Sequence, residues 1–178
     1  GPLSMDTESI VLGLLMSGPK TGYRIKAITG KMTTSYNLSL NQIYPALRKI
    51  EAAGLVKKEV VFQTGKPNKH VYSITDKGRQ YFFESMEAPS MPFDYQLDFL
   101  TRAFFFRFLP EEKIMTRFEE EIDSLEEQLH DLDQIRTTTE AKADENGRFV
   151  YNTIVAMIQM LRDRYAQELA RRMSEHKT

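Results

Sequence analysis

The sequence predicts a mainly α-helical protein made of two domains, at residues 5–88 and 89–178. Residues 5–88 contain three helical patterns, two short β-branched segments around a turn, and a further helical pattern. Residues 89–178 contain two long helical patterns. The first domain has a net charge of +5, from 12 Lys and Arg against 7 Asp and Glu, and the second has −6, from 12 against 18. This asymmetry indicates an anionic partner for the first domain.

The composition of the 178 residues excludes several classes of protein. Hydrophobic residues make up 41% and charged residues 28%, which suffices for a core in a soluble protein. The absence of cysteine excludes a disulfide framework and a thiolate metal site. No apolar run approaches the ~20 residues that a membrane span needs, so we expect a cytoplasmic protein without a membrane partner. Residues 1–4, Gly-Pro-Leu-Ser, resemble the remnant of a cleaved purification tag.

Residues 39–55 form the segment around which the first domain is organised. An apolar stripe recurs at helical spacing, at Leu40, Ile43, Leu47 and Ile50. Polar residues lie off this stripe and are expected to face outward, at Asn41, Gln42, Tyr44, Arg48 and Lys49. Gly54 is expected to end the helix in the left-handed conformation, and Pro45 favours a helix start between Ser39 and Asn41. An outward face of amides and cations suits a helix that reads base edges and holds phosphates.

The neighbouring elements distinguish this segment from an ordinary amphipathic surface helix. Helices are expected at 6–16, 21–32 and 76–86, and strands at 55–62 and 70–74 around a turn at 63–69. Asp6 or Thr7, Thr21 and Thr75 are the expected N-terminal caps. Helix, helix, helix, hairpin, helix is the order of a winged helix-turn-helix module, whose third helix enters the major groove while the hairpin contacts the backbone or the minor groove. The sequence therefore predicts an N-terminal winged helix-turn-helix domain that binds double-stranded DNA.

The candidate DNA-contacting residues lie on the second helix, the third helix and the hairpin tip. They are Tyr23, Lys26, Ser39, Asn41, Gln42, Tyr44, Arg48, Lys49, Lys66, Lys69 and His70. Gln42 is expected to pair with adenine through both atoms of its amide, and Arg48 and Lys49 to contact phosphate or guanine. The alternatives are a solvated surface position for Gln42 and Lys49, and a core position for Tyr23.

The second domain is expected to be an α-helical dimerisation domain. After a linker at 88–93, an aromatic-rich helix is expected over 94–108, buried on several sides. Long helices are expected from Pro110 and over 149–173, and the first of them carries a heptad seam typical of a coiled coil. We expect a homodimer held by Phe118, Ile122, Leu125, Leu129, Ile154, Met157, Leu161, Tyr165 and Leu169. The alternative is that the seam packs on the last helix of the same chain.

Three segments of the first domain resemble the PadR family of bacterial transcriptional regulators. Residues 41–55, NQIYPALRKIEAAGL, resemble its recognition helix, residues 21–25, TGYRI, its second helix, and residues 65–79 its wing and following helix. Residues 98–103, DFLTRA, and the chain length resemble the longer subfamily, whose helical C-terminal domain is shared with a group of virulence activators. The resemblance implies a homodimeric repressor that binds a pseudo-palindromic operator and is released by a small molecule, which in the namesake branch is a phenolic acid such as p-coumarate.

The aromatic segment of the second domain is the candidate effector site. Phe93, Phe105 and Phe106 would line it and Arg102 would bind a carboxylate as a fork, whereas the alternative is plain packing in a core or dimer interface. The sequence contains no recognisable catalytic set, metal-ligand cluster or cofactor motif, so we expect neither an enzyme nor a cofactor. Two other functions stay open, a protein-interaction scaffold and an activator that contacts the transcription machinery.

Overall fold

The computed structural model describes residues 5–30, 38–142 and 144–176, with the backbone alone at 137–142. The expected tag remnant at 1–4 and most of the expected connection at 33–38 lie outside the described residues. The chain divides into an N-terminal unit, Gly1–Phe93, and a C-terminal unit, Asp94–Thr178. We predicted this boundary at 88/89, where the last helix of the first domain ends.

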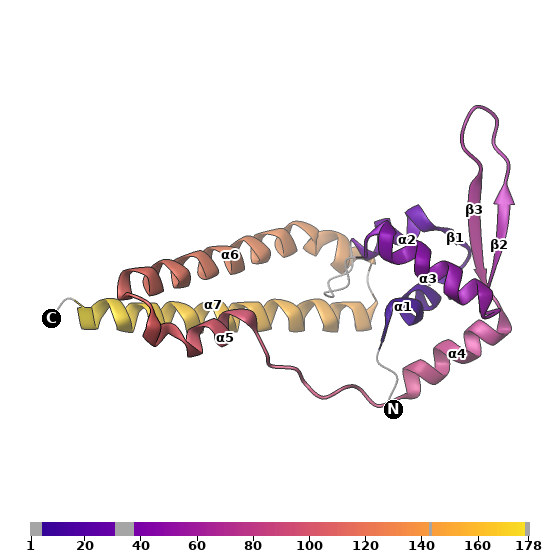
Figure 1. The fold of residues 1–178 in the computed structure, drawn as a ribbon. Helices are drawn as coiled ribbons and strands as arrows, with labels where there is room; N and C mark the ends of the chain where they lie inside the picture. The colour runs from indigo at the N-terminus through magenta and orange to yellow at the C-terminus, as the bar shows by residue number, and fades with distance from the viewer. Residues whose placement is uncertain (1–4, 31–37, 143, 177–178) are drawn as a thin grey trace. The chain divides into compact units, whose positions relative to one another are not determined.

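The N-terminal unit has the element order of a winged helix (Figure 1). Its elements are α1 (Thr7–Leu15), β1 (Lys20–Thr21), α2 (Gly22–Thr29), α3 (Leu40–Ala52), β2 (Val56–Val61), β3 (Lys69–Ile74) and α4 (Asp76–Glu87). The strands form an antiparallel sheet in the order β1-β3-β2, and the β2–β3 hairpin projects from the helices as the wing. The predicted fold class is confirmed, although the short strand β1 was not expected.

Three helices of the N-terminal unit begin at the predicted caps. The side chains of Asp6, Thr21 and Thr75 each accept the backbone N–H three residues later, at 2.9, 3.1 and 3.0 Å. Each bond satisfies an N–H that has no partner within its own helix. α2 ends at Thr29 with Gly30 as its C-terminal cap, and the predicted helix end at residue 32 lies outside the described residues.

The helix α3 has the boundaries that its sequence indicated. Ser39 is its N-cap, and Pro45 lies in its second turn. At the other end Gly54 has φ +75°, and the N–H of Leu55 donates to the carbonyl of Ile50 at 2.8 Å. This 6→1 bond is the Schellman motif, which requires a left-handed residue just past the helix. The predicted role of Gly54 is confirmed.

A single apolar core holds α3 against the rest of the N-terminal unit. Its most enclosed side chains come from α1, α2 and α3, namely Val11, Leu12, Leu15, Ile25, Ile43 and Leu47. α4 lies close to the start of β2, because a Cβ on Gly78 would overlap the carbonyl oxygen of Leu55. With the apolar stripe of α3 buried in this way, its polar face is directed outward.

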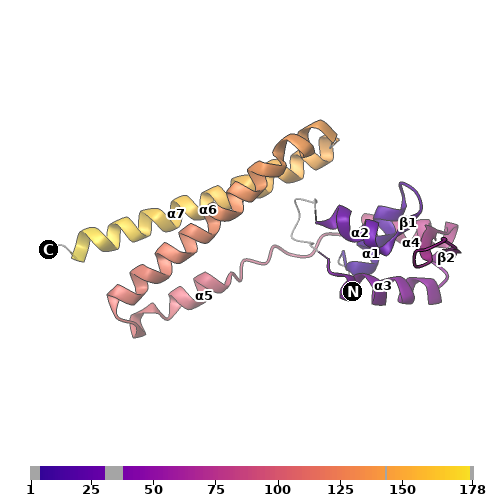
Figure 2. The ribbon, with the colours of Figure 1, turned by 90° about the horizontal axis from the view of Figure 1, so that it is seen from above.

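The C-terminal unit is a long helical hairpin with a short helix packed on it. Its elements are α5 (Asp98–Phe104), the 3-10 helix η1 (Phe106–Phe108), α6 (Glu111–Lys142) and α7 (Glu145–His176). α6 and α7 lie side by side in both views (Figures 1 and 2). They run antiparallel, since Nε2 of His176 at the end of α7 lies 3.3 Å from Oε2 of Glu111 at the start of α6. None of the described helices is long and apolar enough to cross a membrane.

The predicted coiled-coil seam packs inside the chain. Phe118, Leu125 and Tyr165, which we assigned to dimerisation, are buried in the core between α5, α6 and α7. The assigned residues that are partly buried are Ile122, Leu129, Ile154, Leu161 and Leu169. For Phe118, Leu125 and Tyr165 the assignment to a second copy is therefore corrected to packing within one chain, because a heptad pattern defines an apolar face but not which helix covers it. For the partly buried residues the assignment stays a prediction. Met157 on α7 is the one assigned residue that is exposed, at 43%.

The aromatic helix expected over 94–108 is shorter and less buried than predicted. α5 begins at Asp98, and Phe105, with φ −102° and ψ 10°, separates it from η1. Phe99 and Phe106 enter the core, where the Phe99 ring lies 4.6 Å from the ring of Tyr165. Other aromatic side chains of the segment are 71–75% exposed, at Tyr95, Phe104 and Phe108. Burial on several sides was a wrong prediction because a helix of about two turns packs only one face on the hairpin.

Candidate nucleic-acid interface

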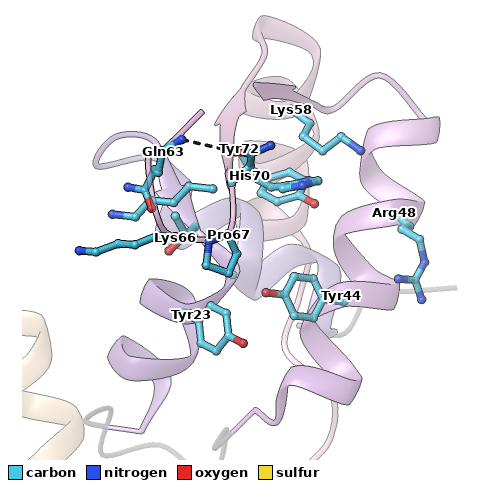
Figure 3. Close-up of a pocket in the computed structure, with 13 residues that line it drawn as sticks. Tyr23, Tyr44, Arg48, Lys58, Gln63, Lys66, Pro67, His70 and Tyr72 are labelled. Atoms are coloured by element: carbon cyan, nitrogen blue, oxygen red, sulfur yellow. Dashed lines mark hydrogen bonds between the residues drawn. The ribbon is translucent and has the colours of Figure 1, made fainter. Parts of the chain in front are cut away.

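A groove of about 780 Å³ lies between the start of α2, α3 and the wing (Figure 3). We call it the wing groove. It is lined by Thr21, Gly22, Tyr23, Tyr44, Arg48, Lys58, Gln63, Lys66, Pro67, Asn68, Lys69, His70 and Tyr72. Among these described residues four are cations, Arg48, Lys58, Lys66 and Lys69, and none is a carboxylate. A concave surface with this charge attracts a polyanion.

Tyrosines from three elements line the wing groove. Tyr23 of α2 is 69% exposed, Tyr44 of α3 is half-buried and Tyr72 of β3 is buried. Figure 3 shows Tyr23 and Tyr44 pointing toward one another. Burial raises the pKa of Tyr44, with a further contribution from Tyr23, and burial followed by the charge of Glu51 raises the pKa of Tyr72. Both phenols are therefore neutral near pH 7 and keep an O–H group that donates hydrogen bonds.

The tip of the wing is shaped by a turn that carries cations. Gly65 adopts φ +72°, a left-handed conformation that favours glycine. The Asn68 side-chain oxygen accepts the backbone N–H of Gln63 at 3.3 Å across the turn, the bond dashed in Figure 3. Lys66 and Lys69, on either side of Pro67 and Asn68 in this segment, both line the wing groove.

The structure brings together part of the predicted DNA-contacting set. The predicted residues that line the wing groove are Tyr23, Tyr44, Arg48, Lys66, Lys69 and His70. The sequence analysis did not include Lys58 among the candidates. The strand pattern contained a signal for it, since Lys58 is paired with Tyr72, and Val60 with His70, in the hairpin register. Side chains paired across antiparallel strands share a face, so the alternation of β2 would have placed Lys58 beside Tyr72.

The first turn of α3 presents the predicted residues Ser39, Asn41 and Gln42, all exposed and outside the lining of the wing groove. Oε1 of Gln42 accepts the backbone N–H of Ser39 at 3.0 Å and the Ser39 hydroxyl at 3.2 Å. Pairing with adenine through both amide atoms would need this same oxygen. The two-atom pairing that we expected for Gln42 is therefore incompatible with an intact contact to Ser39.

Two predicted cations lie away from the wing groove. Nζ of Lys49 is 3.2 Å from Oε1 of Glu8, so the side chain is directed toward α1. Lys26 is exposed on α2 but is not among the groove residues. Within α3, Arg48 and Lys49 thus face different surroundings even though they are neighbours in sequence.

The candidate effector residues do not share one environment. Phe106 is buried in the core of the C-terminal unit, whereas Phe105 is 51% exposed. Nε of Arg102 donates to Oδ2 of Asp98 at 2.7 Å on the exposed surface of α5. Phe93 ends the N-terminal unit and is 75% exposed. Among the described residues, no group of three or more His, Asp or Glu side chains is arranged to hold a metal ion.

Known proteins are similar to this chain in sequence and in fold. Residues 11–84 match the model of the transcriptional regulator PadR-like family. The negative transcriptional regulator PadR of Bacillus subtilis (strain 168) is 26% identical over 124 residues, 68% of each chain. The PadR-like transcriptional regulator BC1756 from Bacillus cereus has a TM-score of 0.84 at 27% identity, covering 96% of this chain and 99% of that chain.

A DNA complex of a relative shows the same fold. Bacillus subtilis PadR in complex with operator DNA has a TM-score of 0.80 at 20% identity, covering 93% of this chain and 98% of that chain. The family match therefore spans the winged helix, and the structural similarity extends over the C-terminal unit as well. Residues 11–84 belong to the PadR-like family of transcriptional regulators, and the whole chain has the fold of a solved PadR-like regulator.

Proposed function

We propose that the chain is a homodimeric repressor that binds a pseudo-palindromic DNA operator and is released by a small-molecule effector. The observation that carries the proposal is the wing groove, a cation-lined surface without a carboxylate beside the exposed face of α3. A duplex with its major groove on α3 would bring a phosphate backbone into the wing groove. The protein would act by binding alone, without catalysis or a cofactor, in the cytoplasm where chromosomal DNA lies.

The relatives support the DNA-binding part of the proposal. The B. subtilis relative carries the name negative transcriptional regulator, and its structure with operator DNA has the fold of this chain. In this chain the phenols of Tyr23 and Tyr44 and the cations of Arg48, Lys58 and Lys66 would contact phosphates. These contacts would position the protein, and the first turn of α3 would read base edges.

The dimer is supported by apolar surface that one chain leaves exposed in the C-terminal unit. Phe104 and Phe108 are each 71% exposed, and Leu100 and Leu109 are 44% and 41% exposed. Exposed large apolar side chains gathered within residues 100–109 mark an interaction surface, and a second copy related by two-fold symmetry is the commonest occupant in soluble oligomers. Two copies would set two α3 helices about one DNA turn apart, which matches a pseudo-palindrome.

The effector is proposed from the relative that was solved with p-coumaric acid, a structure with a TM-score of 0.75 at 20% identity. A phenolic acid combines an aromatic ring with a carboxylate, and Phe105 with Arg102 offers matching chemistry on the exposed side of the C-terminal unit. To bind a carboxylate as a fork, Arg102 would have to exchange its bond to Asp98. The effector would release the operator by favouring a spacing of the two winged helices that does not fit DNA.

Selection from a library of DNA duplexes with a randomised central segment tests the function and identifies the operator sequence in the same experiment. We expect enrichment of an imperfect palindrome, and binding of the enriched duplex that weakens steeply as salt rises, measured by fluorescence anisotropy. Added p-coumaric acid should lower the anisotropy at fixed protein concentration. Binding without sequence preference and without salt dependence would instead favour a protein-interaction scaffold.

A further inference from the structure

Gln42 uses its side-chain carbonyl within the protein. Oε1 lies 3.0 Å from the backbone nitrogen of Ser39 and 3.2 Å from the Ser39 hydroxyl. A backbone N–H can only donate, so the amide atom facing it must be the oxygen and not the nitrogen. A carbonyl oxygen has two lone pairs, and these two donors occupy both.

The position of Gln42 in α3 explains this contact. Gln42 is the third residue of the helix after the N-cap Ser39, where a Gln or Glu side chain reaches back to the N-cap backbone in a capping box. The bond satisfies a backbone donor that the helix itself does not satisfy. Breaking it to free the oxygen would weaken the start of the helix that the proposed function places in the major groove.

The amide nitrogen of Gln42 is the remaining polar atom of this side chain. Both Ser39 and Gln42 are exposed, and they lie in the first turn of α3. In helix-turn-helix proteins the N-terminal residues of the recognition helix are those that contact base edges. Nε2 of Gln42 therefore presents two N–H donors and no acceptor to a bound duplex.

We propose that Gln42 reads the major groove by donation alone, with Nε2 on a base acceptor while Oε1 stays on Ser39. The inference rests on the proposed DNA-binding function and specifies which chemistry one position of each half-site must offer. Acceptors in the major groove are N7 and O6 of guanine, N7 of adenine and O4 of thymine, whereas cytosine presents the N4 amino donor. The selected position excludes cytosine, and it does not single out adenine as a two-atom pairing would.

Two substitutions separate the cap from the base contact. Gln42→Glu keeps acceptor oxygens for Ser39, since Glu is a usual residue of the capping box, but removes both N–H donors. Gln42→Ala removes the cap and the donors together. Full-length parent and variants are each passed through selection on the same randomised duplex library, and their melting temperatures are recorded.

The expected result has two parts. The parent depletes cytosine at one position of each half-site, Gln42→Glu enriches cytosine there because a carboxylate accepts from N4, and Gln42→Ala shows no preference there. Gln42→Glu melts at or above the parent temperature, and Gln42→Ala melts about 2 to 4 °C lower. Base frequencies at one position are compared rather than affinities, because the added charge also repels phosphates.

Three results would overturn the inference in distinguishable ways. Enrichment of the same bases at every position by the parent and Gln42→Glu would overturn the donor role of Gln42 alone. A parent that enriches no sequence would overturn the proposed DNA-binding function, and this inference with it. A Gln42→Glu protein that melts as low as Gln42→Ala would show that the bond to Ser39 does not hold Oε1.

Discussion

The ring of Tyr44 occupies the space that a side chain at Gly22 would need. A Cβ on Gly22 would lie 2.8 Å from Cε1 of Tyr44 and 3.0 Å from its hydroxyl oxygen. Gly22 is the first residue of α2, and Tyr44 lies on the outward side of α3 and lines the wing groove. The absence of a side chain at Gly22 therefore leaves the space that the Tyr44 ring occupies.

Gly22→Ala is expected to displace the Tyr44 ring and weaken DNA binding. Alanine is a good helix former, so the cost comes from the clash and not from α2 itself. Because the clashing atoms are the far end of the half-buried Tyr44 side chain, which lines the wing groove, we expect a stability loss of about 1 kcal/mol, at the low end for an overpacked site. Anisotropy with the enriched duplex and thermal melting give the two values. Ala27→Ser, an uncharged change at an exposed position of the same helix, is the matched control, and equal DNA binding by Gly22→Ala and the parent would contradict the role given to the Tyr44 ring.

Gly78→Ala is expected to disrupt the N-terminal unit. The new Cβ would overlap the carbonyl oxygen of Leu55, which also accepts the N–H of Thr75 at 3.0 Å, and would lie 2.8 Å from Cγ1 of Ile74. Backbone held by hydrogen bonds cannot yield as a side chain can, so the loss should reach about 3 kcal/mol or more. Circular dichroism during heating measures it. Gln80→Ala, on the exposed side of α4, should melt like the parent, and a Gly78→Ala protein that did the same would refute the close packing of α4 on β2.

Lys66 and Lys49 are expected to differ in their effect on the salt dependence of DNA binding. Lys66 lines the wing groove, so Lys66→Ala should weaken binding to all sequences alike and reduce the slope of log affinity against log salt by about 1. Lys49 is directed to Glu8, and its side chain is 74% exposed, so Lys49→Ala should change the slope little and stability by less than about 1 kcal/mol. Equal slopes for the two variants would show that the wing groove does not hold a phosphate backbone.

The helices of the N-terminal unit could be predicted from sequence because their caps depend on neighbouring residues. The caps at Asp6, Thr21 and Thr75 and the left-handed Gly54 act within a few residues, so the sequence pattern contains them in full. The strand β1 was missed because it has two residues and exists only through its pairing with β3. A pairing between residues about fifty positions apart leaves no local pattern.

The side-chain conformations of the candidate site and the packing of the second domain could not be predicted from residue spacing alone. The pattern placed Gln42 on the outward face of α3, but the bond of its oxygen to Ser39 depends on a side-chain conformation. The alternation of apolar residues identified the seam around Phe118 and Leu125, yet a seam packs equally well on α7 or on a second chain. The abundance of aromatic residues near Phe104 likewise suggested burial, and only the short length of α5 shows why most of them stay exposed.

The exposed aromatic surface of α5 and η1 is expected to carry the dimer. Phe104 and Phe108 are each 71% exposed, and the guanidinium of Arg107 lies 4.6 Å from the centre of the Phe108 ring. The double variant Phe104→Ser, Phe108→Ser should therefore be monomeric at concentrations where the parent is dimeric, as measured by sedimentation velocity. Its helical content should be unchanged, because neither ring belongs to the core of the C-terminal unit.

Two control variants distinguish the loss of this interface from a general loss of apolar surface and from unfolding. Phe62→Ser removes an 81% exposed ring from the wing end of the N-terminal unit and should leave the dimer intact. Phe99→Ala removes a ring that is 8% exposed and packed at 5.1 Å on Phe118, so it should lower the melting temperature, at a cost of about 3 to 5 kcal/mol. If the double variant sedimented as the parent does, the dimer would have to form elsewhere, and the exposed Met157 and Met160 on α7 would be the next surface to vary.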